Sequence, residues 1–249
     1  MENALREWVR SVVPGRLRRS ARRWTRRPPV GFVRFGSLRR VRPVCPDWGF
    51  SRGRPIDRYY IERFLAAHAA DIRGRVLEIG ADTYTRAFGG ARVTHRDVLH
   101  VAEAGPGTTI VADLADGAGL DSDAFDCAII TQTLQCIYDV AAAARTIHRI
   151  LRPGGVALVT VPGISKISRH DMDRWGYYWS FTTASAHRLF QEAFFGGEVR
   201  VAAHGNVLVA SAFLHGLAAE ELRPRELDHV DPDFEVVITV RARKAEPRS

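Results

Sequence analysis

Short apolar runs alternate with amphipathic segments along most of the chain. Apolar runs bounded by polar or glycine residues predict strands, and they cover residues 75–79, 92–99, 108–112, 125–131, 156–161, 199–203 and 234–242. Apolar residues at helical spacing predict helices over residues 56–72, 139–151, 182–194 and 206–222. Because strands and helices alternate, the pattern predicts an α/β fold, with a mostly parallel sheet covered by helices on both faces.

The connections after the first two predicted strands are short. About ten residues separate Gly80 from the second strand, and about nine separate the second strand from the third. A parallel crossover usually needs a dozen residues or more. We therefore expect clipped helices, of a single turn each, after strands 1 and 2.

Length and composition favour one large domain with an N-terminal extension. The chain has 249 residues and is 46% hydrophobic, which is ample for one sizeable core. We place a basic extension and its proline-rich linker at residues 1–45, and the domain at residues 46–249. The three cysteines show no paired spacing, so no metal site is expected and a reducing compartment is indicated. With no apolar stretch for a membrane span or a signal peptide, the sequence predicts a cytoplasmic protein.

The net charge of +8 belongs to the extension rather than to the domain. Residues 1–42 hold 13 arginines and only two acidic residues, so the rest of the chain is net negative. A nucleic-acid-binding domain is therefore not expected. Within residues 1–27, apolar residues at helical spacing beside arginines predict a helix on an anionic membrane surface, peripheral at the inner membrane. They are Leu5, Trp8, Val9, Val12 and Val13. The alternative is a basic tail with no partner.

The segment from Arg75 to Asp82 carries the strongest chemical signal. It is an apolar run that reaches Glu78 and then breaks at Gly80. This is the pattern of a buried parallel strand followed by a turn where a ligand can approach bare backbone. A dinucleotide site needs further glycines where Asp82 and Tyr84 stand. The segment therefore predicts a nucleotide-type site and disfavours NAD.

Five segments stand in the order found in class I S-adenosylmethionine-dependent methyltransferases. They are Val76-Leu77-Glu78-Ile79-Gly80, Asp97, Asp113-Leu114, residues 125–132 and Leu151-Arg152-Pro153-Gly154-Gly155. The chain resembles this family, and within it a bacterial group, methyltransferase type 11-like, whose members often accompany glycosyltransferases. The narrower resemblance rests on residues 48–50, 54–60, 161–165 and 173–182. It implies a Rossmann-like sheet of seven strands with an antiparallel last strand, S-adenosylmethionine as cofactor, and a glycosyltransferase as a candidate partner.

The predicted cofactor contacts follow from this resemblance. Glu78 would help to hold the ammonium end of the cofactor. Asp97, about 20 residues beyond the first strand, would accept hydrogen bonds from both ribose hydroxyls, since a carboxylate can accept from two groups at once. Asp113 would accept from the adenine amino group. The other predicted contacts are Gly80 and Ala81 in the turn, Leu114, Thr131, Gln132 and Tyr59.

The segment between the fifth strand and the next helix is expected to face the acceptor. It combines carboxylates with aromatic rings, a combination that suits the hydroxyl groups and C–H faces of a sugar. His170 is the first candidate for a general base, because histidine titrates near neutrality, and Asp171 stands beside it. The predicted acceptor contacts are Asp173, Trp175, Tyr178, Gln135 and Tyr138. We therefore expect a small-molecule or glycan acceptor, with O-methylation of a sugar or glycosylated small molecule in polysaccharide or secondary-metabolite biosynthesis.

Several alternatives stay open at this point. His170 and Asp171 could pair with neighbouring arginines on a solvated loop, and Asp171 with Asp173 could hold a divalent cation, for which two carboxylates are weak evidence. The enzyme could instead methylate an amine or a carboxylate. A third possibility is a non-catalytic partner of a glycosyltransferase that keeps the methyltransferase fold.

Overall fold

The chain divides into two units, Met1–Arg42 and Pro43–Ser249, and the computed structural model describes residues 28–102 and 107–247. The described part of the first unit contains the 3₁₀ turn Gly36–Leu38. The membrane-binding helix predicted within residues 1–27 lies outside the described residues. In the described ranges, no helix combines the length and apolar character needed to cross a bilayer.

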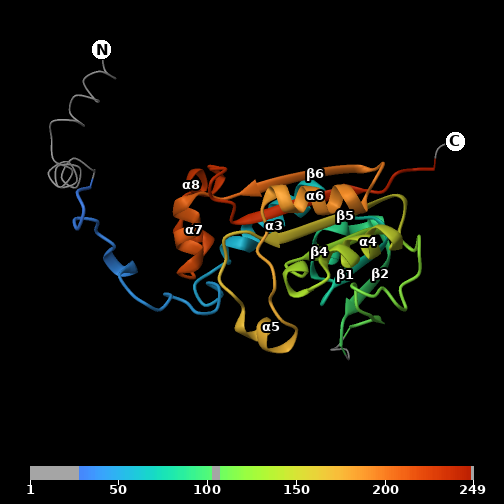
Figure 1. Cartoon of the computed structure of the whole chain (residues 1–249), viewed down its shortest axis with the longest axis horizontal. Helices are drawn as coiled ribbons and strands as arrows, with labels where there is room; N and C mark the ends of the chain where they lie inside the picture. Colours follow the sequence, from blue (N-terminus) through green and yellow to red (C-terminus); the bar gives the residue numbers. More distant parts are fainter. Residues whose placement is uncertain (1–27, 103–106, 248–249) are drawn as a thin grey trace, which may run out of the picture. The chain divides into compact units, whose positions relative to one another are not determined.

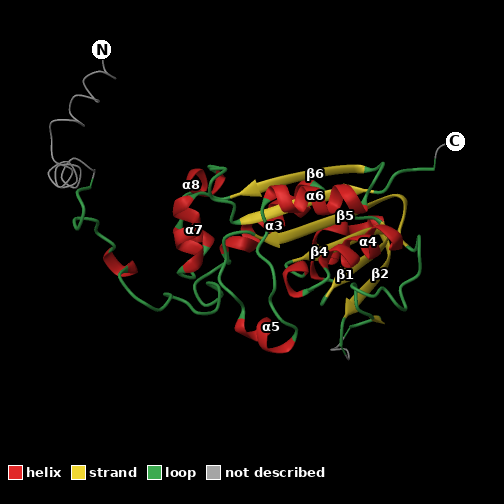
Figure 2. Ribbon diagram, in the orientation of Figure 1, coloured by secondary structure: helices red, strands yellow, loops and turns green. Residues whose placement is uncertain are grey.

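The second unit is built around a seven-stranded sheet of order β3-β2-β1-β4-β5-β7-β6 (Figures 1 and 2). Strands β1 to β5 are parallel, whereas β7 runs antiparallel to both of its neighbours. The strands are β1 (Gly74–Ile79), β2 (Val93–His100), β3 (Ile110–Val111), β4 (Phe125–Thr131), β5 (Leu151–Pro162), β6 (Glu198–His204) and β7 (Val237–Arg243). The predicted Rossmann-like sheet with an antiparallel last strand is confirmed.

Helices cover both faces of this sheet. On one face lie α4 (Val140–Ile150) and α6 (Thr183–Ala193), which Figure 2 shows in front of the strands. On the other face lie α3 (Ile56–Ala67) and α7 (Val207–Leu214). Each face of the sheet forms an apolar core with its helices. Because successive residues of a strand point to opposite faces, Leu77 lies in the core beneath α4 and α6, and Val76 lies in the core beneath α3 and α7. Two short helices, α5 (Arg169–Arg174) and α8 (Pro224–Asp228), complete the unit.

The helix after β1 is clipped, as predicted. It consists of a π-helical turn, Thr85–Gly89, and a 3₁₀ turn, Gly90–Arg92. After β2, the described residues 101–102 and 107–109 contain no helix.

Several predicted boundaries are wrong, among them the end of the helix predicted over residues 56–72, which is at Ala67. The helix predicted over residues 206–222 ends at Leu214, because Gly216 adopts a φ of +68°, where a side chain would also collide with the backbone carbonyl of Cys45. The strand predicted over residues 156–161 begins earlier, because β5 starts at Leu151, which pairs with Phe125 before the ladder resumes at Val156 after a bulge.

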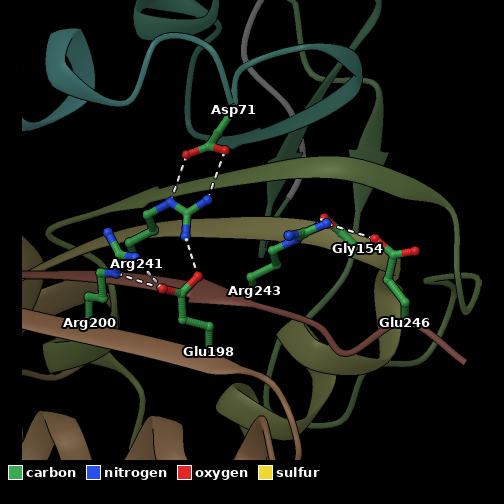
Figure 3. Close-up of polar contacts among 7 residues, drawn as sticks. All are labelled: Asp71, Gly154, Glu198, Arg200, Arg241, Arg243 and Glu246. Atoms are coloured by element: carbon green, nitrogen blue, oxygen red, sulfur yellow. Dashed lines mark hydrogen bonds and ion pairs between the residues drawn. The ribbon is translucent and has the colours of Figure 1, made fainter. Parts of the chain in front are cut away.

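Arg241 of β7 ties the C-terminal strands to the segment between α3 and β1 (Figure 3). Its Nε and Nη2 donate to the two carboxylate oxygens of Asp71 at 2.8 and 3.0 Å, and its Nη1 donates to Glu198 at 3.1 Å. The bond to Asp71 raises the pKa of Arg241, against the effect of burial. Figure 3 also shows Arg243 of β7 beside Gly154, whose carbonyl accepts from its Nε at 3.2 Å. The bulged start of β5 is therefore held by β7.

Candidate active site

A cavity of about 580 Å³ opens at the carboxyl ends of the parallel strands. Its walls include Gly80 after β1, His100 at the end of β2, residues 112–115 after β3 and Gln132 after β4. Ligands of open α/β sheets bind at this edge, and the volume lies within the range of about 300–1,000 Å³ found for small-molecule sites. We call it the first cavity.

Gly80 gives the first cavity a stretch of bare backbone. Its φ is +80°, its N–H donates to the carbonyl of Leu99 at 3.0 Å, and no atom lies within 4 Å of the place where a Cβ would stand. A side chain here would be strained and would project into open space. The backbone at Gly80 therefore leaves room for the close approach of a ligand that the sequence predicts at this turn.

Asp113 and Leu114 also line the first cavity. Asp113 is exposed just beyond β3, and its Oδ1 accepts from the backbone N–H of Ala115 at 2.7 Å. Leu114 is buried beside it. A carboxylate next to an apolar wall has the chemistry expected for a purine amino group and ring.

Glu78 does not line the first cavity, and its carboxylate binds backbone and side-chain groups of the turn after β1. It is buried in β1, where its carboxylate accepts from the N–H of Tyr84 at 3.0 Å and from the N–H and hydroxyl of Thr85, both at 2.7 Å. Burial raises the pKa of Glu78, against the effect of the hydrogen bonds from Thr85. The carboxylate thus organises the clipped turn after β1, outside the cavity wall, and Ala81 is exposed beyond that wall. Contact of either residue with the cofactor stays a prediction.

Asp97, predicted to bind the ribose hydroxyls, lies inside the sheet rather than in the cavity wall, and its contact with the cofactor stays a prediction. Asp97 pairs with Leu77 in the middle of β1, is 4% exposed, and accepts from Arg75 Nε at 2.7 Å and from Thr109 Oγ1 at 3.0 Å. A distance of about 20 residues in the sequence does not determine how far along β2 a residue lies. The pairing register of β1 and β2 determines which side chain of β2 reaches the cavity.

His100 occupies the edge position instead. It ends β2 one step beyond the pair Ile79 and Leu99, and it lines the first cavity. Its Nδ1 lies 3.0 Å from the carbonyl oxygen and 3.2 Å from the nitrogen of Ala102, so Nε2 remains for a ligand. The ring also contacts Trp175 edge-on, with the centroids 6.0 Å apart. The sequence signal that could have found His100 is its place as the first polar residue after Val98 and Leu99.

The predicted acceptor residues divide between cavity wall and surface. Trp175, Tyr178 and Tyr138 line the first cavity, and the rings of Tyr138 and Tyr178 lie 5.3 Å apart. Asp173 instead pairs with Arg169 at the surface, at 2.6 Å. Among the described residues, no group of three or more histidine, cysteine, aspartate or glutamate side chains could hold a metal ion.

Asp171 and His170 form a pair at the edge of the cavity. The Nδ1 of His170 lies 3.2 Å from Asp171 Oδ1. Asp171 lines the cavity, whereas His170 is largely exposed and reaches Trp175 with a ring contact of 5.8 Å. Tyr59 lies elsewhere, donating to Asp228 at 2.8 Å. Its packing against Tyr60 on α3 makes it part of the helix surface rather than of the cavity wall.

A second cavity of about 180 Å³ adjoins the first and shares Gln132 and Asp171 with it. Its polar wall is formed by Asp57, Arg58, Thr131, Gln132, Gln135, Ser165, Ser168, Asp171 and Tyr177. Burial raises the pKa of Asp57, against the charge of Arg58, and burial raises the pKa of Tyr177 to about 12. Gln132 has a φ of +49°, a strained conformation for a residue with a side chain and one that clusters at functional sites. Thr131 and Gln135, both predicted site residues, lie here.

A family comparison identifies the class of protein to which this fold and its cavities belong. A family model described as a methyltransferase domain matches residues 52–199. The match covers more than half of the chain, so the chain belongs to this methyltransferase family. A comparison with curated proteins found no match.

Solved structures share the fold at low sequence identity. An S-adenosylmethionine-dependent methyltransferase from Mesorhizobium loti is 20% identical, with a TM-score of 0.50 over 76% of this chain and 98% of that one. One from Archaeoglobus fulgidus is 12% identical, with a TM-score of 0.50 over 75% and 94%. At these identities the likeness concerns the fold. With the family match, the prediction of a methyltransferase enzyme is confirmed, and S-adenosylmethionine is supported as its cofactor.

Proposed function

We propose that the enzyme transfers a methyl group from S-adenosylmethionine to a hydroxyl group of a sugar or a glycosylated small molecule, in polysaccharide or secondary-metabolite biosynthesis. The observation that carries this proposal is the junction of the two cavities at Gln132 and Asp171. The first cavity has the bare backbone and the carboxylate that suit the cofactor, and the second has a wall of hydroxyl, amide and carboxyl groups. An acceptor in the second cavity would face the cofactor across the shared residues.

The side chains of the first cavity match the polar groups of the cofactor. Gly80 would admit the methionine part, Asp113 would accept from the adenine amino group, and Leu114 would pack against the ring. In place of Asp97, His100 would face a ribose hydroxyl through its free Nε2. S-adenosylmethionine, when bound, supplies a methyl group that is already activated for displacement.

The protein then has to align the acceptor and remove one proton. Alignment alone can supply about 7–11 kcal/mol of the barrier, and a positioned base adds roughly 10²–10⁴-fold. As the acceptor oxygen bonds to the methyl carbon and the carbon–sulfur bond breaks, Asp171 would take the hydroxyl proton. His170, 3.2 Å from Asp171 and open to solvent, would carry that proton away. We therefore assign Asp171 the base role and His170 the role of a proton relay from Asp171 to solvent.

The test begins with calorimetry of S-adenosylmethionine binding and continues with transfer of an isotope-labelled methyl group to a panel of glycosides, read by mass spectrometry. We expect Asp171→Asn to lose about 10² or more in kcat, and His170→Ala to lose less. Asp121→Asn is the matched control, since Asp121 is exposed and lines neither cavity. No cofactor binding at millimolar concentration would refute the enzyme proposal. Full turnover in both Asp171→Asn and His170→Ala would favour an amine or carboxylate acceptor.

We also propose that residues 1–27 bind an anionic membrane surface, on the grounds of their arginines and apolar stripe. The test compares vesicles containing an anionic lipid with neutral vesicles, using the full chain and a variant with Arg18, Arg19, Arg22 and Arg23 replaced by serine. Equal binding of both chains would refute the proposal. A glycosyltransferase partner, suggested by the resemblance, stays a prediction that co-purification with neighbouring pathway enzymes can test.

A further inference from the structure

We propose that the second cavity selects an uncharged, polyhydroxylated ring, and that Gln135 and Arg58 bind two hydroxyl groups of it. The inference rests on the proposed function and narrows its substrate class from sugars in general to neutral ones. Three observations carry it: an unpaired buried oxygen, an unpaired buried nitrogen, and the charge of the cavity wall.

The unpaired oxygen belongs to Gln135. This residue lines the second cavity and is 3% exposed, and its Nε2 donates to the carbonyl of Gln132 at 2.7 Å. Its Oε1 is buried and has no hydrogen-bond partner within the described part of the chain. Buried polar atoms are rarely left unsatisfied in native proteins. This oxygen can therefore accept a hydrogen bond from a molecule bound in the cavity.

The unpaired nitrogen belongs to Arg58. Its Nη1 is buried and finds no hydrogen-bond acceptor among the described residues, since Asp57 Oδ2 lies 3.6 Å away. Arg58 also lines the second cavity. This nitrogen can donate to a bound molecule, so the same small cavity offers a ligand one accepting atom and one donating atom.

A hydroxyl group is the chemical group that meets both needs, because it can donate and accept. A carboxylate or phosphate only accepts and would leave Gln135 unpaired. An ammonium group only donates and would leave Arg58 unpaired. Two hydroxyl groups of one ring can serve both residues at once.

The charge of the wall also disfavours an anionic ring. The charge of Arg58 is offset by Asp57, and Asp171 adds a further carboxylate. Lys166 is turned to other partners: its Nζ lies 4.2 Å from the ring centroid of Trp48 and donates to the carbonyl of Pro46. The positive charge of Arg58 is thus outweighed by the carboxylates of Asp57 and Asp171 on the same wall, which disfavours an acidic sugar.

Aromatic side chains complete the second cavity. Trp48, Phe50 and Phe213 line it, and the rings of Trp48 and Phe213 pack with centroids 5.5 Å apart. Such rings can pack against the C–H face of a pyranose while its edge hydroxyls reach Gln135 and Arg58. The apolar wall and the two unpaired polar atoms therefore point to the same class of ligand.

The experiment measures binding of named sugars to the full chain loaded with S-adenosylhomocysteine. Methyl glycosides of glucose, galactose, mannose and rhamnose are compared with the methyl glycosides of glucuronate and galacturonate, by saturation-transfer NMR and titration. We expect at least one neutral glycoside to bind, and its uronate counterpart to bind about tenfold more weakly or not at all. We expect Gln135→Met and Arg58→Met each to weaken the neutral glycoside about fivefold or more, the loss of one hydrogen bond.

Matched controls keep these results interpretable. Gln191→Met and Arg188→Met make the same chemical changes on exposed positions of α6 and should leave binding unchanged. Thermal melting and S-adenosylhomocysteine affinity of each variant report on folding and on the first cavity. Because the side chain of Arg58 is 32% exposed, Arg58→Met tests the proposal even where Gln135→Met fails to fold.

Three outcomes would overturn the inference: tighter or equal binding of a uronate, neutral binding that neither variant weakens, or no glycoside binding of either charge. The proposed function fails separately. A chain that binds neutral glycosides through Gln135 but does not bind S-adenosylhomocysteine would refute methyl transfer and leave the ligand class of the second cavity supported.

Discussion

Replacement of His100 and of Asp97 should separate cofactor binding from stability. His100 ends β2 at the cavity wall with Nε2 free for a ligand, whereas Asp97 lies in the middle of the same strand with both of its oxygens in protein contacts. We therefore expect His100→Ala to weaken S-adenosylmethionine binding. Asp97→Asn should destabilise the fold and leave the affinity nearly unchanged.

The magnitudes follow from the contacts that each residue makes. A hydrogen bond from a neutral side chain contributes about 0.5–1.5 kcal/mol, so His100→Ala should raise the Kd by roughly 2–13-fold. Loss of the edge-on contact with Trp175 would add to this effect. Asp97→Asn leaves the partly buried Arg75 guanidinium without its carboxylate, and the free energy of unfolding should fall by about 1–3 kcal/mol.

Calorimetry gives the Kd of each variant, and urea unfolding gives its stability. His187→Ala is the matched control, because His187 is exposed on α6. The reasoning is refuted if Asp97→Asn raises the Kd tenfold while His100→Ala leaves it unchanged. That result would mean that the ribose contact lies at Asp97 despite the register.

Three further substitutions test the electrostatics of the fold by urea unfolding. Burial raises the pKa of Asp57 above its ordinary 3.8, so its contribution to stability is full below that pH and is lost as the pH rises through the raised value. The unfolding free energy of Asp57→Asn relative to wild type should therefore increase from pH 4 to pH 8, and a constant difference would contradict this. Arg241→Met should cost roughly 1.5–3 kcal/mol through its charged hydrogen bonds to Asp71, with the exposed Arg188→Met as control. Glu78→Gln should lose about 1–3 kcal/mol, because the carboxylate accepts through both oxygens, from Tyr84 and from Thr85, whereas an amide has only one accepting oxygen; an unchanged stability would show that these bonds contribute little.

The periodicity of apolar residues predicts most of the helices and strands, because the burial of apolar side chains largely decides whether a segment forms a helix or a strand. The strand predicted over residues 125–131 coincides with β4, and the helix predicted from residue 182 or 183 coincides closely with α6. Tertiary contacts decide the exceptions. Gly154 and Gly155 have the local character of a turn, yet pairing of the preceding Leu151 with Phe125 extends β5 back through them. Gly216 ends α7 because Cys45, remote in the sequence, packs against it.

The candidate site is predictable where it follows directly from strand ends. Gly80, Asp113 and Gln132 stand just after β1, β3 and β4, and all three line the first cavity. Asp57 and Arg58 could not be predicted, because they come from the start of α3 and meet the end of β4 only in the folded chain. The choice between Asp97 and His100 needed the strand register, which no spacing in a single sequence supplies.

The position of β7 also has a consequence for synthesis of the chain. β7 fills the place between β5 and β6, but it begins about 75 residues after β5 ends. At roughly 5–20 residues per second, the outer edge of β5 would stay unpaired for about 4–15 s on the ribosome. Asp71, which precedes Arg241 by 170 residues, waits about 9–34 s for its partner at the same rate. An open, apolar strand edge is a template for aggregation, so the nascent enzyme should depend on chaperones that bind such edges during this interval.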